Sequence, residues 1–212
     1  MVRAVFFDVG GTLIHTDPRT WLPPVLERFG ERADWTRLRP AAEDAYAYYN
    51  AHHMAATDRE KAIRLWWEFD RRLLAGLGVK NPERIADWLV ENWRDPTLWP
   101  RTPGTPEVLE ELRARGLLLA VVSNWDVLLP EILEAMGLAR YFERIYASAA
   151  LGVQKPDPAI YRRALGELGL RPGEVLFVGD RPEADYEAPR RLGMRALLVR
   201  PDEGIVPVRR VL

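Results

Sequence analysis

The sequence predicts an α/β fold: a parallel sheet covered by helices on both faces, with an all-helical domain inserted after the first strand. Three observations indicate this fold. An apolar strand at residues 3–8 opens the chain, and residues 15–99 then carry helical patterns only. From residue 103 onward, helical segments alternate with short apolar runs. Such alternation is typical of a doubly wound parallel sheet.

The inserted segment contains four expected helices with recognisable ends. Asp58 and Asn81 stand where N-capping residues belong, and Pro82 follows Asn81 at the first helical position. Gly78 provides a stop for the third helix. The four helices are expected at residues 21–29, 36–56, 59–77 and 82–92.

The second half of the chain alternates helix and strand. A glycine follows each helix, as Gly116 and Gly137 do, because glycine readily adopts the left-handed conformation that ends a helix. Residues from Pro201 onward lack this pattern, and we expect them to form a surface extension. The helices are expected at 106–115, 128–136, 158–168 and 183–192, and the strands at 117–122, 145–148, 174–178 and 196–199.

These boundaries predict two domains. Residues 1–14 and 100–212 form a Rossmann-like core domain around the parallel sheet, and residues 15–99 form the small helical domain. A chain of 212 residues with 48% hydrophobic content is long enough to bury a core and a small second domain.

Composition excludes several classes of protein. A net charge of −1 leaves no broad basic surface for nucleic acid, and no apolar run approaches the ~20 residues of a membrane span. The first strand begins where a signal peptide would lie. The absence of cysteine excludes disulfides, thiolate metal sites and a cysteine nucleophile. We expect a cytoplasmic protein with no nucleic-acid or membrane partner; its oligomeric state is not indicated.

Polar residues follow three of the apolar strands. Because the carboxyl ends of parallel strands meet at one edge of a sheet, we expect these side chains to converge there. Lysine is rare in this chain, so a lysine in the loop before a helix indicates that a compact positive charge is required. The residues concerned are Asp8, Ser123 with Asn124, Asp180 with Asp185, and Lys155.

In order and spacing, these residues resemble the motifs of the haloacid dehalogenase-like (HAD) hydrolase superfamily. The stretches Ser123–Asp126 (SNWD) and Gln154–Pro158 (QKPDP) are similar to those of the subfamily with a helical cap after the first strand. The resemblance implies that Asp8 is the nucleophile and Lys155 its catalytic partner. It also implies a phosphate site of Ser123, Asn124, Lys155 and Gly11, and a Mg²⁺ site of Asp8, Gly10, Asp180 and Asp185.

The reaction implied by this resemblance is hydrolysis of a small phosphorylated metabolite. A carboxylate attacks phosphorus, an aspartyl-phosphate forms, and water then releases it. Attack by an anion on a dianion requires a divalent cation, and Mg²⁺ suits a site made of oxygen ligands. Ser123 and Lys155 would neutralise charge on the phosphoryl oxygens.

One position departs from the phosphatase pattern. Phosphatases that the chain resembles carry a general-acid aspartate two residues after the nucleophile, where this chain has Gly10. We therefore expect a slow or specialised phosphohydrolase, with Asp17 or His15 as candidate substitute acids. The alternative is a catalytically impaired protein that binds a phosphorylated ligand and acts as a regulatory module.

Tryptophan is concentrated in the helical segment. One hypothesis is that these residues pack a small domain that needs large side chains. The other is that one or two face the active site as an apolar lid. The sequence does not choose between the two hypotheses for residues 21, 35, 66, 67, 88, 93 and 99, seven of the eight tryptophans.

Overall fold

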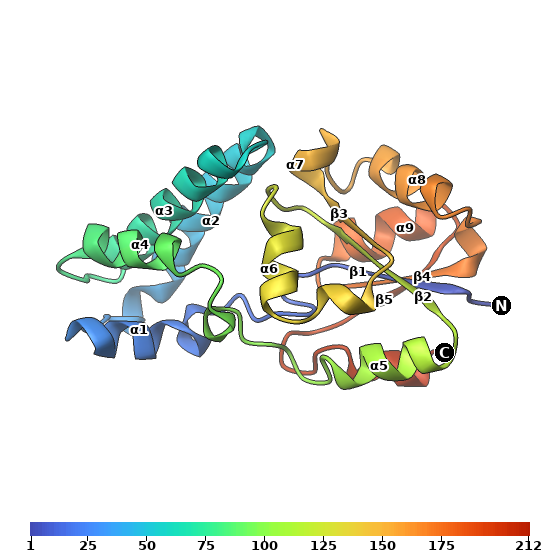
Figure 1. Cartoon of the computed structure of the whole chain (residues 1–212), viewed down its shortest axis with the longest axis horizontal. Coiled ribbons are helices and arrows are strands. Elements are labelled where there is room, and N and C mark those ends of the chain that lie inside the picture. The colour runs from blue at the N-terminus through green and yellow to red at the C-terminus, as the bar shows by residue number, and fades with distance from the viewer.

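The computed structural model describes all 212 residues and consists of a sheet-containing part and a group of helices beside it (Figure 1). All five strands are parallel and form one sheet in the order β3-β2-β1-β4-β5. The predicted α/β class with a parallel Rossmann-like sheet is therefore confirmed. The strands are β1 (Ala4–Phe7), β2 (Leu118–Ser123), β3 (Arg144–Ala147), β4 (Val175–Gly179) and β5 (Arg195–Leu198).

Helices cover both faces of the sheet because its central strands are apolar on both. Val5 and Phe7 of β1 face the core under α5 (Glu107–Ala114) and α6 (Leu129–Ala135). Ala4 and Phe6 point the other way, toward α8 (Pro158–Glu167) and α9 (Ala188–Arg191). All four of these strand residues are fully buried.

Four α-helices and no strand occupy the segment between β1 and α5. We call these helices the helical insert; its apolar residues belong to the same buried cluster as α5 and α6. That residues 15–99 form a separate domain stays a prediction. The helices are α1 (Leu22–Phe29), α2 (Leu38–His52), α3 (Arg59–Gly76) and α4 (Pro82–Glu91).

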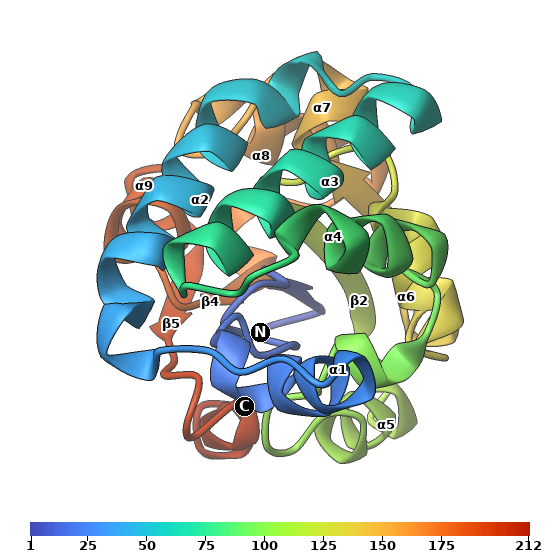
Figure 2. The same ribbon diagram turned by 90° about the vertical axis from the view of Figure 1, so that its left-hand side faces the viewer.

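The two connections to the helical insert run side by side. Ile14 bridges Arg101 in antiparallel fashion, and the His15 N–H donates to the Pro100 carbonyl at 2.8 Å. The chain therefore leaves and re-enters the sheet-containing part at one place. Figure 2 shows the resulting arrangement, with α2, α3 and α4 lying across the end of the sheet.

Helix ends follow the predicted capping with one exception. The Asp58 carboxylate accepts the Lys61 N–H at 2.9 Å and caps α3 as expected. Asn81 does not cap α4; its side-chain amide instead donates to Glu31 at 2.8 Å. The capping prediction for Asn81 was wrong because a carboxylate distant in sequence competes for the same side chain.

Two predicted helices differ in detail, and one short helix was not predicted. The helix expected over residues 36–56 is α2 with a 3₁₀ turn at each end, and a π-helical turn, η7 (Pro182–Glu187), precedes α9. A short helix, α7 (Ser148–Leu151), was not predicted.

No helix in the structure combines the length and apolarity needed to cross a bilayer.

The C-terminal residues are not a surface extension, and that prediction was wrong. Ile205 and Val208 are fully buried in the main apolar cluster. The turn that contains Val208, η8 (Val206–Arg210), lies against α5, and Arg209 pairs with Glu111 of that helix. The tail thus returns to the core through two apolar side chains spaced three residues apart.

Candidate active site

Asp8 lies at the centre of the carboxyl edge, immediately after β1. Its side chain is nearly buried, and its Oδ1 accepts two hydrogen bonds, from Ser123 Oγ at 2.7 Å and from Lys155 Nζ at 2.8 Å. Ser123 is the last residue of the adjacent strand β2. No side chain donates to the second oxygen of Asp8. The two donors hold the carboxylate in one orientation.

Lys155 is a buried cation held between two carboxylates. Its Nζ donates to Asp8 and, at 2.6 Å, to Asp185. Burial disfavours the ammonium, but the Asp185 and Asp8 charges outweigh it and raise the pKa of Lys155. Asn124 fixes the loop: its side chain donates to the Lys155 carbonyl at 2.8 Å and accepts the Lys155 N–H at 2.7 Å. The lysine is therefore charged and positioned from both ends.

Asp180, which follows β4, has an incomplete environment. Its Oδ1 is buried without a hydrogen-bond partner. Burial, followed by the charges of Asp8 and Asp185, raises the pKa of Asp180 to about 7. A buried carboxylate oxygen without a donor is costly, so this oxygen is available to a ligand from outside the protein.

The acidic cluster fits a divalent cation. Asp8, Asp180 and Asp185 each place a carboxylate oxygen within 4.8 Å of the other two. One lysine cannot balance three carboxylates, and a hard cation with oxygen ligands suits the remaining charge. Asp185 already accepts from Lys155 through Oδ1 and from the Arg181 N–H through Oδ2 at 3.0 Å. Asp8 and Asp180 therefore have the more available oxygens.

The two glycines after Asp8 play different parts. Gly11 has φ +75°, and a Cβ there would overlap the Asp180 carboxylate. The Gly11 N–H donates to the Ile14 carbonyl at 2.8 Å, so it is not available to a phosphate, unlike the prediction. Gly10 lines the cavity and has no positive φ; a Cβ there would lie 3.2 Å from the Thr16 methyl carbon.

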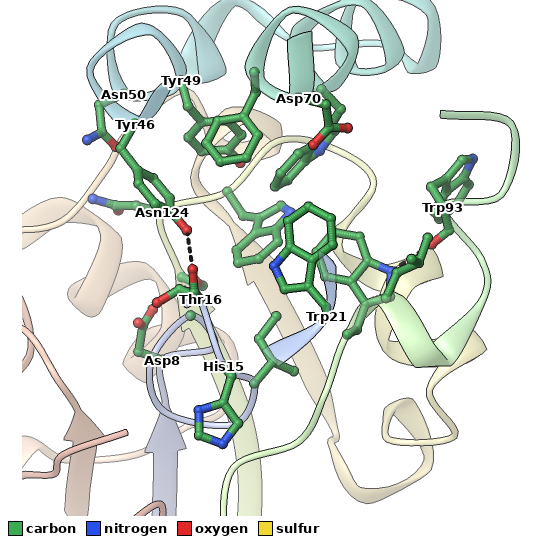
Figure 3. A pocket seen from close by; sticks show the side chains of 18 of the residues that line it. Asp8, His15, Thr16, Trp21, Tyr46, Tyr49, Asn50, Asp70, Trp93 and Asn124 are labelled. Atoms are coloured by element: carbon green, nitrogen blue, oxygen red, sulfur yellow. Dashed lines mark hydrogen bonds between the residues drawn. The ribbon is translucent and has the colours of Figure 1, made fainter. Parts of the chain in front are cut away.

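A cavity of about 240 Å³ opens above these residues, between the sheet edge and the helical insert. Its floor includes Asp8, Lys155 and Asp180, and its wall is aromatic. Figure 3 shows Asp8 below and the residues of the helical insert above. Four of the seven tryptophans of residues 15–99 line it, which supports the lid hypothesis: Trp21, Trp66, Trp93 and Trp99.

The helical insert is fastened to the core at Asp126, which is fully buried. Its Oδ2 accepts from Tyr49 of α2 and from the Trp66 indole of α3, both at 2.9 Å. Burial raises the pKa of Asp126, and the donors, including the Leu128 N–H, oppose that rise. Tyr46 of α2 also donates, at 3.0 Å, to the carbonyl of Thr16 in the connection between β1 and α1 (Figure 3).

Of the two candidate substitute acids, the structure brings only one to the cavity. His15 is among the lining residues. Asp17 is not, because its carboxylate caps a 3₁₀ turn and pairs with Arg19 at 2.6 Å. Arg19 lowers the pKa of Asp17, so that group is a poor proton donor.

Sequence reasoning missed two carboxylates, Asp70 and Asp126. Both are buried, and Asp70 lines the cavity from α3. A signal for Asp70 was available, since an aspartate stands between Phe69 and the apolar pair Leu73 and Leu74 on the buried side of a helix. An acidic residue on such a side is rare unless it is paired or has a ligand.

The family assignment comes from comparisons with known proteins. A sequence profile of the haloacid dehalogenase-like hydrolases matches residues 2–193. The haloacid dehalogenase-like hydrolase domain-containing protein 3 of Homo sapiens is 39% identical over 149 residues, which is 68% of this chain and 59% of that protein. The phosphoserine phosphatase of Thermus thermophilus is 37% identical over 127 residues, 59% of this chain and 50% of that protein.

The chain thus spans less than two thirds of these relatives. Among solved structures, a dehalogenase crystal structure superposes with a TM-score of 0.64 at 23% identity, covering 93% of this chain and 84% of its own. The crystal structure of a predicted phosphoglycolate phosphatase from Haemophilus somnus superposes with a TM-score of 0.61 at 19% identity. The match covers 99% of this chain and 97% of that one. At such identities the likeness concerns the fold alone. The profile match over nearly the whole chain shows that the protein belongs to the haloacid dehalogenase-like hydrolases.

Proposed function

We propose that this hydrolase is a Mg²⁺-dependent phosphohydrolase that acts on a small phosphorylated substrate through an aspartyl-phosphate on Asp8. The observation that carries the proposal is the arrangement around Asp8: two donors on one carboxylate oxygen and an acidic cluster with an unpartnered oxygen beside it. Relatives named as phosphoserine and phosphoglycolate phosphatases favour the same reaction class.

In the first half-reaction, the Asp8 carboxylate attacks phosphorus and the ester oxygen leaves with the bonding electrons. Ser123 and Lys155 contact Asp8 now, so they are placed to donate to phosphoryl oxygens that approach it. Mg²⁺, held by Asp8, Asp180 and the Gly10 carbonyl, would supply positive charge to the phosphoryl group. Asp185 keeps Lys155 in place, and the aromatic wall gives the substrate an apolar surface.

In the second half-reaction, water attacks the phosphorus of the acyl phosphate, and Asp8 is regenerated as inorganic phosphate departs. The phosphatase pattern uses its second aspartate to protonate the leaving group and to activate this water. Gly10 provides neither function. We therefore propose that esters whose leaving groups depart as stable anions are the better substrates.

Gly10 also favours a second candidate, a module that binds a phosphorylated ligand without useful turnover. The residues that bind phosphate and metal would be the same in this module as in the phosphohydrolase. The two candidates differ in whether Asp8 forms a covalent bond.

A panel of aryl and alkyl phosphate esters, assayed with Mg²⁺ and again with EDTA, tests the proposal. We expect metal-dependent release of phosphate in the wild type. Asp8→Asn, which keeps the shape but cannot attack, should lower kcat by at least about 10⁴-fold. The control is Asp44→Asn, the same change at an exposed position of α2. Binding of phosphate without turnover of any ester would favour the module, and halide release from 2-haloacids alone would contradict both candidates.

A further inference from the structure

Asp70 is a carboxylate that the proposed chemistry does not use. It lies on α3, is 7% exposed and lines the cavity, at the opposite end from Asp8 (Figure 3). It takes part in no hydrogen bond or ion pair within the protein. The only cause acting on its pKa, which is raised well above the usual range, is burial. Asp70 is thus an unpartnered polar group that faces the cavity.

The neighbouring donors are already occupied. The Trp66 indole donates to Asp126, and the Trp99 indole donates to the Trp93 carbonyl at 2.7 Å. The adjacent arginines of α3 point elsewhere: Arg71 pairs with Glu68, and Arg72 pairs with Glu68 and Asp44. No positive charge of the protein compensates Asp70. A cationic ligand in the cavity would supply the missing partner and favour the ionised carboxylate.

The cavity that Asp70 lines has a largely aromatic wall. Tyr46 and Phe69 meet edge to face at 5.0 Å, Trp66 packs against Phe69 at 5.3 Å, and Trp99 against Trp66 at 5.5 Å. All four rings line the same cavity. The faces of aromatic rings attract cations, and rings around a carboxylate recognise ammonium groups well. Neutral leaving groups would fit the apolar wall but would leave the carboxylate without a partner.

We propose that the part of the cavity lined by Asp70, Tyr46, Phe69, Trp66 and Trp99 binds a cationic nitrogen on the leaving group of the substrate. The substrate class is then a phosphate monoester with an amine or quaternary ammonium at the end remote from phosphorus. This inference rests on the proposed function for the position of the phosphate. The cation site itself does not depend on the proposed chemistry and can be measured without turnover.

The first experiment measures cation binding directly. Phenyltrimethylammonium is titrated into the protein and followed by tryptophan fluorescence, with tert-butylbenzene as the uncharged analogue. We expect saturable binding of the cation that Asp70→Asn weakens at least about tenfold and that Asp44→Asn leaves unchanged. Equal binding of cation and analogue, or equal binding by wild type and Asp70→Asn, would overturn the proposal.

The second experiment compares 4-(trimethylammonio)phenyl phosphate with 4-tert-butylphenyl phosphate. The ratio of their kcat/KM values is taken in the wild type and in Asp70→Asn, so that the intrinsic difference between the two leaving groups cancels. We expect Asp70→Asn to lower this ratio at least about tenfold, mainly through KM. An unchanged ratio would overturn the proposal. Cation binding that depends on Asp70, with no turnover of either ester, would contradict the phosphohydrolase and leave the cation site intact.

Discussion

In the proposed mechanism, the glycine at position 10 limits the chemistry that Asp8 can perform. Gly10 stands where a proton donor would be needed, Asp17 is held by Arg19, and His15 is the remaining titratable group nearby in the sequence that lines the cavity. Because Gly10 has no positive φ, a side chain there does not strain the backbone. It requires only that the Thr16 methyl, 3.2 Å from an added Cβ, move by a few tenths of an ångström.

Gly10→Asp should therefore restore general-acid catalysis. We expect hydrolysis of alkyl phosphates to rise by about 10²- to 10⁴-fold, with a smaller gain for p-nitrophenyl phosphate, whose leaving group needs no proton. The measurement is kcat/KM for the two ester classes. Gly10→Ala is the matched control, since it adds the same Cβ without an acid. An equal gain in both variants, or none for alkyl esters in Gly10→Asp, would refute the argument.

Asp70 predicts how stability depends on pH. Its pKa is raised by burial, so the folded protein disfavours the ionised form. The contribution of the neutral carboxyl group to the free energy of unfolding is fully present below the pKa of the unfolded chain, about 4. It is lost as pH rises through the higher pKa of the folded protein. Tyr46 beside it does not ionise in this range, because burial raises its pKa to about 12.

Asp70→Asn should consequently gain stability relative to wild type as pH rises from about 4 to 8. Melting temperatures of the two proteins across this range, without ligand, give the measurement. Asp44→Asn, at an exposed site, should show no such trend. A constant difference between Asp70→Asn and wild type would show that Asp70 does not titrate differently in the folded protein.

At the scale of elements, the sequence predicts where strands end, but not what the buried side of a helix contacts. An apolar run that stops at Asp8, Ser123 or Asp180 identifies both a strand and a residue at the shared edge. Helical periodicity shows which side of α3 is buried, but not whether that side contacts the core or the cavity. The pattern alone could therefore not show that Asp70 and Trp66 line the cavity.

Asp126 joins two helices of the helical insert to the loop after β2 through buried hydrogen bonds. Replacing it by alanine leaves the Tyr49 hydroxyl and the Trp66 indole N–H buried without an acceptor. Each such donor costs about 1–3 kcal/mol, so Asp126→Ala should lower the free energy of unfolding by at least about 2 kcal/mol. Chemical denaturation of the wild type and the variant measures this change in the free energy of unfolding. Glu43→Ala, which breaks an exposed pair with Arg39, should cost under about 0.5 kcal/mol; similar losses in both variants would contradict the assignment.

At the scale of the whole molecule, distant contacts account for what the sequence did not reveal. The tail returns to α5 through Ile205 and Val208, and Asn81 bonds Glu31 instead of capping its helix. Both depend on partners remote in the chain, which local patterns do not encode. The order of helices and strands, by contrast, follows from glycine stops and apolar runs, and it places Asp8, Ser123, Lys155 and Asp180 around one cavity.

The proposed function concerns the molecule as a whole, because the proposed nucleophile, the charges around it and the aromatic wall of the cavity come from separate segments. Without an acid–base residue at position 10, hydrolysis of the acyl phosphate should be slower than its formation from an activated ester. The covalent intermediate should then accumulate. The most direct measurement is acid quenching during turnover of p-nitrophenyl phosphate with Mg²⁺, followed by mass spectrometry of the peptide that contains Asp8. We predict a phosphoryl group on Asp8 in most molecules; release of p-nitrophenol with no phosphoryl group on Asp8 would contradict the mechanism.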